Sequence, residues 1–193
     1  MFEVEEFVTQ CRAALSEHTP QLAIKELLER TVADPAAVAK ALGPAEAAGL
    51  TPLCRGADLT ILRVIWAPGM TLFPHEHRMW AVIGLYGGEE QNAFFRRREA
   101  GIAPAGGKDL VRSDTVLLGD DVIHAVTNPR EIPAEAIHIY GGDFFDTPRS
   151  EWDPITLQER EFRVENALRA FAEANSAWAT ERTAAGGAES VGS

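Results

Sequence analysis

The sequence contains few cysteines, only Cys11 and Cys54, and they lie far apart in the chain. Such a pair excludes a disulfide framework and lacks the spacing of a cysteine-based metal site. The chain also lacks an apolar run near the ~18 residues that a membrane-spanning helix needs. Its first residues, MFEVEEFVTQ, are acidic and have no apolar centre, unlike a signal peptide. We therefore expect a soluble, cytoplasmic protein with no membrane partner.

Positive charge is also scarce. The chain has 18 Lys and Arg residues against 29 Asp and Glu residues, so its formal net charge is -11. This balance argues against nucleic acid or an anionic membrane surface as a partner. With 193 residues, 46% of them hydrophobic and 24% charged, the composition is that of one ordinary globular domain. A chain of this length can bury a core without disulfides.

The first quarter of the chain has helical patterns. Apolar residues recur at helical spacing in residues 3–16 and 20–31, and residues 34–48 are rich in alanine. Asp34 followed by Pro35 is typical of a helix start. We expect an N-terminal helical arm over residues 1–50.

From about residue 57 the pattern changes to short apolar segments separated by Gly and Pro turns. This spacing favours an antiparallel sandwich or barrel, which we place at residues 51–148. Within it, the glycine-rich stretch 101–109 is expected to be a loop.

The end of the chain again shows helical spacing, with apolar residues recurring between positions 156 and 179. We expect a C-terminal helix over residues 149–183 and a disordered, small and polar tail over residues 184–193. Two roles for the helical arms stay open. They either cover the mouth of the barrel or form the contact of a homodimer.

Histidines give the main chemical signal. Four of the five lie in the β region, and His75 and His77 are two positions apart, so on a strand both face the same side. His124, from a neighbouring strand, would complete a set of three nitrogen ligands. Neutral imidazole suits Fe, Zn, Ni or Cu. Three protein ligands leave positions open, as in a catalytic metal site.

Two runs around these histidines resemble the two motifs of the cupin family. They read Gly69-x5-His75-x-His77 and Gly119-x4-His124-x3-Asn128. The resemblance implies a mainly β fold, the cupin double-stranded β-helix, which is a small jelly-roll barrel, with N- and C-terminal α-helices added. It also implies that His75, His77 and His124 bind one metal ion.

Two further features resemble the thiol dioxygenase branch of the cupins, the cysteine and 3-mercaptopropionate dioxygenases. Ala81 stands where many cupins have a Glu ligand, and that branch binds iron(II) through three histidines alone. His138 and Tyr140 match its Ser-x-His-x-Tyr run, although Ala136 replaces the serine. The resemblance implies Fe(II), dioxygen and a small-molecule thiol that becomes a sulfinate. His138 and Tyr140 are then the catalytic residues, since a phenol near a metal can donate a proton.

The sequence offers three candidates for substrate binding. Thiol dioxygenases of this kind hold the substrate carboxylate with an arginine before the barrel motif, and Arg55 is the arginine in that stretch. Arg78, directly after His77, could pair with a carboxylate through two hydrogen bonds, although strand alternation turns it away from the histidines. Trp80 falls where the mercaptopropionate type has a tryptophan.

Two other functions stay open at this stage. One is a different metal-dependent cupin enzyme, an isomerase, lyase or hydrolase acting on a small acidic metabolite, because one fold hosts many chemistries. The other is a non-catalytic metal-binding sensor.

Overall fold

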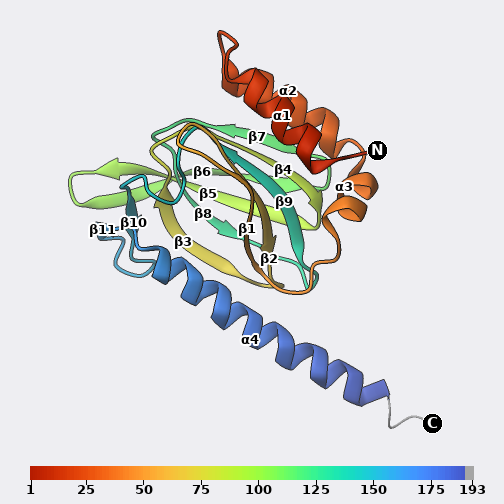
Figure 1. Cartoon of the computed structure of the whole chain (residues 1–193). Helices are drawn as coiled ribbons and strands as arrows, with labels where there is room; N and C mark the ends of the chain where they lie inside the picture. Colours follow the sequence, from red (N-terminus) through yellow and green to blue (C-terminus); the bar gives the residue numbers. More distant parts are fainter. Residues whose placement is uncertain (190–193) are drawn as a thin grey trace.

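Two antiparallel β-sheets lie face to face in the computed structural model, which describes residues 1–189 (Figure 1). The first sheet has the order β1 (Gly49–Arg55), β2 (Thr60–Trp66), β9 (Ala134–Tyr140), β4 (Ala81–Gly87), β7 (Thr115–Leu118). The second has the order β11 (Glu159–Glu161), β10 (Ser150–Trp152), β3 (Thr71–Glu76), β8 (Ile123–Thr127), β5 (Glu89–Arg98), β6 (Gly101–Val111). Strands distant in sequence pair in both sheets, so the chain crosses repeatedly between them. This arrangement is the predicted double-stranded β-helix.

The space between the sheets is the main core. Leu62, Val64 and Trp66 alternate along β2 and turn inward, as a strand with one face on the core requires. Ala81 and Ile83 of β4 meet them from the same sheet. This inner face holds the histidines described below.

Within residues 1–189, four helices flank the sheets: α1 (Val4–Ala14), α2 (Pro20–Val32), α3 (Pro35–Leu42) and α4 (Val164–Glu189). The first three pack on the outer face of the first sheet, where a second apolar cluster includes Phe7 and Ile24 of the helices with Val82 and Ile137 of the strands (Figure 1). The predicted N-terminal helical arm is thus confirmed, although α3 ends at Leu42 and β1 begins at Gly49, two residues before the predicted barrel boundary.

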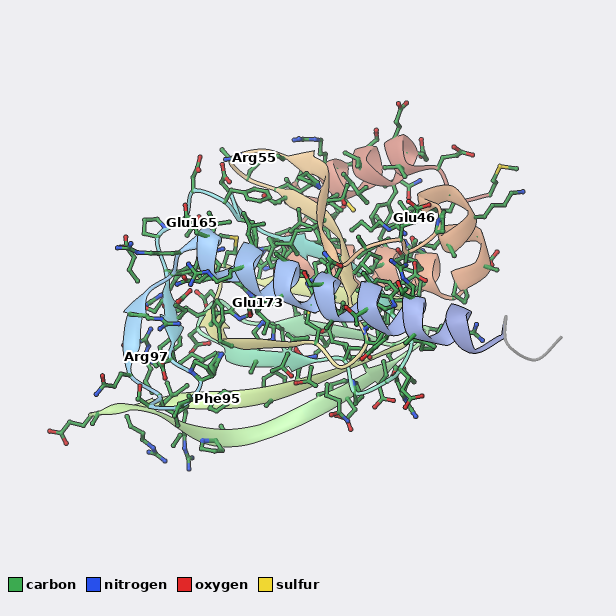
Figure 2. The ribbon with its side chains drawn as sticks, turned by 90° about the horizontal axis from the view of Figure 1, so that it is seen from below. Glu46, Arg55, Phe95, Arg97, Glu165 and Glu173 are labelled. Atoms are coloured by element: carbon green, nitrogen blue, oxygen red, sulfur yellow. The ribbon has the colours of Figure 1, made fainter. Side chains whose placement is uncertain are left out.

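Helix α4 lies across the open side of the barrel (Figures 1 and 2). Its Phe171 stacks on Trp66 at a centroid distance of 5.3 Å, and Asn175 exchanges two hydrogen bonds with the backbone of Ala48, of 2.7 and 2.9 Å. Because Phe171 belongs to the inner core, α4 covers the barrel, one of the two roles left open by the sequence. Within residues 1–189, no helix has the length and apolar character to cross a membrane.

A bulge in β3 decides which face the histidines occupy. Leu72 pairs with Val126, but the next register pair is His75 with His124, so β3 contains one extra residue between the two pairs. Simple alternation from the inward Leu72 would turn residue 75 outward, and the extra residue turns it back to the inside. Pro74 lies in this irregular stretch, where the missing N–H group is tolerated.

Two predictions about local structure are wrong. Residues 101–109 are not a loop, because they belong to β6, which pairs with β5 along its whole length. Pro104 and the three glycines are accommodated because β6 is an edge strand with a register shift opposite Phe94 and Phe95.

The C-terminal helix also begins later than predicted. Residues 150–152 and 159–161 form the β10–β11 hairpin, and α4 starts at Val164. The helix continues to Glu189, so residues 184–189 of the predicted disordered tail are helical. The rest of that tail, residues 190–193, lies outside the described part of the chain.

Gly84 provides a test of the packing of α2 on β4. A Cβ atom at this position would lie 2.7 Å from Leu28 Cγ. We expect Gly84→Ala to lower the free energy of unfolding by about 1–3 kcal/mol, because the helix has to shift. Urea denaturation followed by circular dichroism measures this change. Gly49→Ala is the matched control, since a Cβ there has no neighbour within 4 Å; equal stability of both variants would contradict the packing described.

Candidate metal centre

The three predicted ligands meet inside the barrel. His75 is the next-to-last residue of β3, His77 directly follows the strand, and His124 lies on β8. All three are buried. One ligand atom from each lies within 4.8 Å of the others, and the Nε2 atoms of His77 and His124 are 3.4 Å apart. Two nitrogens bound to one ion at ~2.1 Å are separated by roughly 3.0 to 3.4 Å. The predicted convergence is therefore confirmed.

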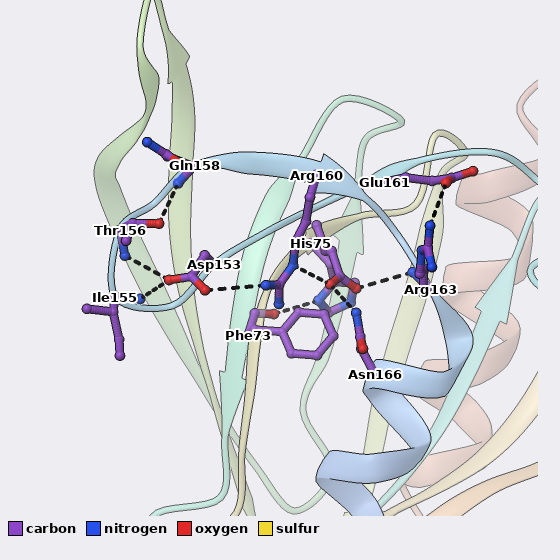
Figure 3. Close-up of polar contacts among 11 residues, drawn as sticks. Phe73, His75, Asp153, Ile155, Thr156, Gln158, Arg160, Glu161, Arg163 and Asn166 are labelled. Carbon is purple, nitrogen blue, oxygen red and sulfur yellow. Dashed lines mark hydrogen bonds and ion pairs between the residues drawn. The ribbon is translucent and has the colours of Figure 1, made fainter.

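Hydrogen bonds on the far side of two rings orient them toward this point. Nδ1 of His75 lies 3.0 Å from the carbonyl oxygen of Phe73 (Figure 3), and Nδ1 of His124 lies 2.7 Å from the side-chain oxygen of Asn92. Since both partners accept, the Nδ1 atoms carry the hydrogens. The Nε2 lone pairs of His75 and His124 are then free to bind a metal.

Burial keeps all three imidazoles neutral. Removal from water lowers the pKa of His75 to about 4 and holds the pKa values of His77 and His124 well below the ordinary value, with a further lowering from the neighbouring histidines. A neutral imidazole binds a metal without first losing a proton. The donor set therefore fits Fe, Zn, Ni or Cu.

His138 and Tyr140 reach the same cavity from β9. The Tyr140 hydroxyl lies 3.0 Å from His138 Nδ1, and the Tyr140 ring lies 4.9 Å from that of His77. Burial raises the pKa of Tyr140, so its hydroxyl keeps its proton at neutral pH. The structure therefore brings both predicted catalytic residues beside the three histidines.

Glu90 is a residue of this site that sequence reasoning missed. Its carboxylate is fully buried at the start of β5, accepts hydrogen bonds from Trp66 Nε1 at 2.8 Å and Asn92 Nδ2 at 3.0 Å, and lies 3.4 Å from His138 Nε2. Burial alone raises its pKa, but His138, Asn92 and Trp66 outweigh burial and lower that pKa. Glu90 thus lies at ion-pair distance from His138, whose Nε2 has no hydrogen-bond partner among the described residues. In the sequence it was only a charged residue after a Gly-Gly turn.

Arg149 is the second residue that was missed. It is 7% exposed, and its guanidinium lies 4.5 Å from the ring centroid of Phe144 and 4.0 Å from that of Phe162. One nitrogen donates to the carbonyls of Phe144 and Thr147, while the buried Nε has no hydrogen-bond partner among the described residues. Burial lowers its pKa to about 10. No motif marks Arg149 in the sequence, where it falls in the segment predicted to be helical.

The cavity at the histidines is small and mostly apolar. It has about 30 Å³ of free space, with Trp66, Phe144 and Phe162 in its wall together with the three histidines, His138 and Tyr140. Val164 and Ala167 of α4 also line it. A larger groove of about 980 Å³ lies elsewhere, on the surface between α1 and α3.

The three predicted substrate-binding residues do not line this cavity. Arg78 lies beyond the end of β3 with a φ of 58°, and its exposed side chain pairs with Glu76 at 2.6 Å. Arg55, labelled at the edge of the molecule in Figure 2, is about half-exposed and pairs with Asp146 at 3.0 Å. Trp80 packs in the outer cluster beneath the helices. All three thus lie outside the lining of this cavity, and their role in substrate binding stays a prediction.

Polar contacts fasten the beginning of α4 beside the metal centre. The buried Glu151, which pairs in register with His75, accepts from Arg160 Nε and Asn166 Nδ2, both at 2.7 Å, and from the backbone N–H of Arg163 at 3.3 Å (Figure 3). This carboxylate joins β10, β11 and α4. It thereby positions the C-terminal wall of the cavity.

Comparisons with known proteins return structural neighbours only. No family model and no curated protein matches the sequence. An RmlC-like cupin family protein with a double-stranded β-helix fold, from Methanocaldococcus jannaschii, is 10% identical, with a TM-score of 0.43 over 51% of this chain and 84% of its own. An uncharacterized conserved protein with a double-stranded β-helix domain, from Klebsiella pneumoniae, is 12% identical, with a TM-score of 0.44 over 57% and 89%.

Oxalate oxidase in complex with the substrate analogue glycolate is a further neighbour, 17% identical, with a TM-score of 0.42 over 52% of this chain and 55% of its own. All three scores lie below 0.5. The description of the fold therefore rests on this chain's own strand pairing, and the neighbours' activities remain theirs.

The buried histidines predict a pH-dependent stability of the metal-free protein. Between about pH 6.5 and pH 4 the unfolded chain binds protons at His75 while the folded chain does not, so the free energy of unfolding falls as the pH falls. The pKa shift of His75 alone corresponds to a loss of about 3 kcal/mol. Urea denaturation of metal-free protein at a series of pH values measures it.

Two variants serve as comparisons for this titration. We expect His75→Gln to flatten the pH dependence, and His18→Gln, at an exposed position of the N-terminal arm, to leave it unchanged. The same slope in all three proteins would show that the buried imidazoles are not its source.

Proposed function

We propose that this protein is a mononuclear non-haem iron(II) dioxygenase that oxidises a small anionic thiol to a sulfinate. The observation that carries the proposal is the donor set: three buried, neutral imidazoles converge, and no carboxylate of the described residues belongs to the group. Because these ligands are neutral, they leave the double charge of a divalent ion in place, which favours an anionic further ligand such as a thiolate.

His75, His77 and His124 would hold the iron, and the bound iron would supply the redox chemistry that dioxygen requires. Overall, a thiol R–SH and O₂ give the sulfinate R–SO₂⁻ and one proton, so both oxygen atoms remain in the product and no external reductant is consumed. The apolar wall formed by Trp66 and Phe144 excludes bulk water from the reacting atoms.

Tyr140 and His138 are placed to handle the proton. A carboxylate accepts hydrogen bonds, so the nearby Glu90 favours a hydrogen on His138 Nε2 and leaves Nδ1 to accept from the Tyr140 hydroxyl. Tyr140 can then pass its proton to His138 Nδ1, and Glu90 stabilises the positive charge on that ring. His138 and Glu90 thereby stabilise the Tyr140 side chain both with and without its proton.

Arg149 favours an acidic substrate. Its guanidinium is a buried cation with an Nε atom that has no hydrogen-bond partner among the described residues, and it lies against two aromatic residues of the cavity wall. A substrate carboxylate would satisfy this donor and compensate the buried charge. The free space of about 30 Å³ limits the substrate to a few heavy atoms and requires the wall near Phe162 to move when it enters.

Oxygen uptake by the iron(II)-loaded protein with a panel of small thiols tests the reaction. We expect uptake with one thiol or a few, with a matching amount of sulfinate. His124→Ala should reduce the rate at least about 100-fold because a ligand is lost. His18→Ala is the control and should retain full activity. Stoichiometric iron without uptake for any thiol would overturn the proposal and favour a metal-dependent reaction without dioxygen, or a binding role.

The role of Arg149 is tested by comparing two thiols, one with a carboxylate and one without. We expect Arg149→Lys to lower kcat/KM for a carboxylated thiol such as 3-mercaptopropionate about 10-fold or more, because a lysine cannot reproduce the planar guanidinium. The effect on cysteamine, which lacks the carboxylate, should be small. Arg55→Lys, at an exposed arginine, should affect neither substrate. Equal losses for both thiols would contradict carboxylate binding by Arg149.

A further inference from the structure

Glu90 differs from the other buried carboxylates close to the site. Glu76 pairs with Arg78 and Arg97, and Glu151 pairs with Arg160, although the exposed fractions of both glutamates are only 1% and 0%. Glu90 is equally buried, yet within the described residues His138 is its only neighbour at ion-pair distance. A buried carboxylate without a permanent cation is costly, so its charge needs a compensating partner.

Glu90 connects to a metal-binding histidine through one side chain. Its Oε1 accepts from Asn92 Nδ2 at 3.0 Å, which fixes the amide so that the Asn92 oxygen faces His124 Nδ1 at 2.7 Å. The hydrogen of His124 is therefore held on Nδ1 and its Nε2 lone pair points into the three-histidine cluster. A chain of this kind also increases the basicity of the ligand nitrogen.

The second oxygen of Glu90 faces the His138–Tyr140 pair. Oε2 accepts from Trp66 Nε1 at 2.8 Å and lies 3.4 Å from His138 Nε2. Trp66 thus fixes the carboxylate in the orientation that brings it next to His138. The Glu90 side chain consequently contacts both Asn92, which orients the ligand His124, and His138, which lies beside the Tyr140 hydroxyl.

We propose that Glu90 is the positioning residue of this centre and the anion that offsets one charge of the metal ion held by His75, His77 and His124. It acts on His124 through Asn92 and on Tyr140 through His138, without binding the metal. The inference rests on the proposed function in requiring a divalent metal at the three histidines. It adds that an anionic substrate neutralises the single positive charge that then remains on the ion.

The test measures metal affinity and activity separately. Dissociation constants for Co²⁺ are determined by competition with a chelator in the wild-type protein, in Glu90→Gln and in Glu89→Gln, and the visible absorption spectrum of bound Co²⁺ reports its coordination. Glu89 is the matched control, because it carries the same charge one position earlier but pairs with Arg130.

We expect Glu90→Gln to weaken Co²⁺ binding about 10-fold to 100-fold and to lower kcat at saturating iron, with both changes small in Glu89→Gln. A merely structural role would lower the stability of metal-free and metal-bound protein equally and would leave the dissociation constant unchanged. That result would overturn the inference alone. Failure of the wild-type protein to bind Co²⁺ or Fe²⁺ would overturn the proposed function and the inference with it.

Asn92→Ala provides a second variant, which serves also if Glu90→Gln does not fold. It breaks the connection to His124 but leaves Glu90 beside His138. We expect Asn92→Ala to bind Co²⁺ more weakly than the wild-type protein, because His124 loses the partner that orients it. Unchanged Co²⁺ affinity in Asn92→Ala would show that the path from Glu90 to His124 has no effect on the metal.

Discussion

The pairing of His75 with His124 across β3 and β8 is the constraint on which the candidate site depends. It exists because β3 contains one extra residue after Leu72, which turns His75 to the inside of the barrel. His77 follows on the same side, and the three rings then converge within 4.8 Å. Without this extra residue, strand alternation would turn His75 to the outer face of the sheet, and no three-histidine cluster would form.

Burial then determines the chemistry available to the cluster. Imidazoles removed from water are neutral, carboxylates need a compensating charge, and a phenol keeps its proton. The same inner face holds His138, Tyr140 and Glu90, so a divalent ion, a proton donor and an anion can act in a space that excludes bulk water. In such surroundings electrostatic interactions are stronger than at the surface, and each polar group without a partner costs more free energy.

The segment after the barrel contributes as much to the site as the motif strands do. Arg149 precedes β10, Glu151 lies opposite His75, and Phe162 and Val164 close the cavity at the start of α4. The contacts of Glu151 with Arg160 and Asn166 hold this wall in place (Figure 3). The C-terminal region therefore forms one wall of the cavity at the histidines.

The sequence by itself predicted the fold class, the three-histidine group and the His138–Tyr140 pair. These predictions came from alternation along a strand, the short distance from His75 to His77, and the resemblance of the surrounding motifs to the cupin family. The sequence offered Arg55, Arg78 and Trp80 for substrate binding, which lie outside the lining of the cavity, and it marked neither Glu90 nor Arg149. Only the tertiary structure decided these five positions. The physical reason is that burial, charge pairing and contact between distant strands depend on how the two sheets face each other. The adjacent Glu89 and Glu90, for example, are both buried but pair with different residues, Arg130 and His138, which no local pattern distinguishes.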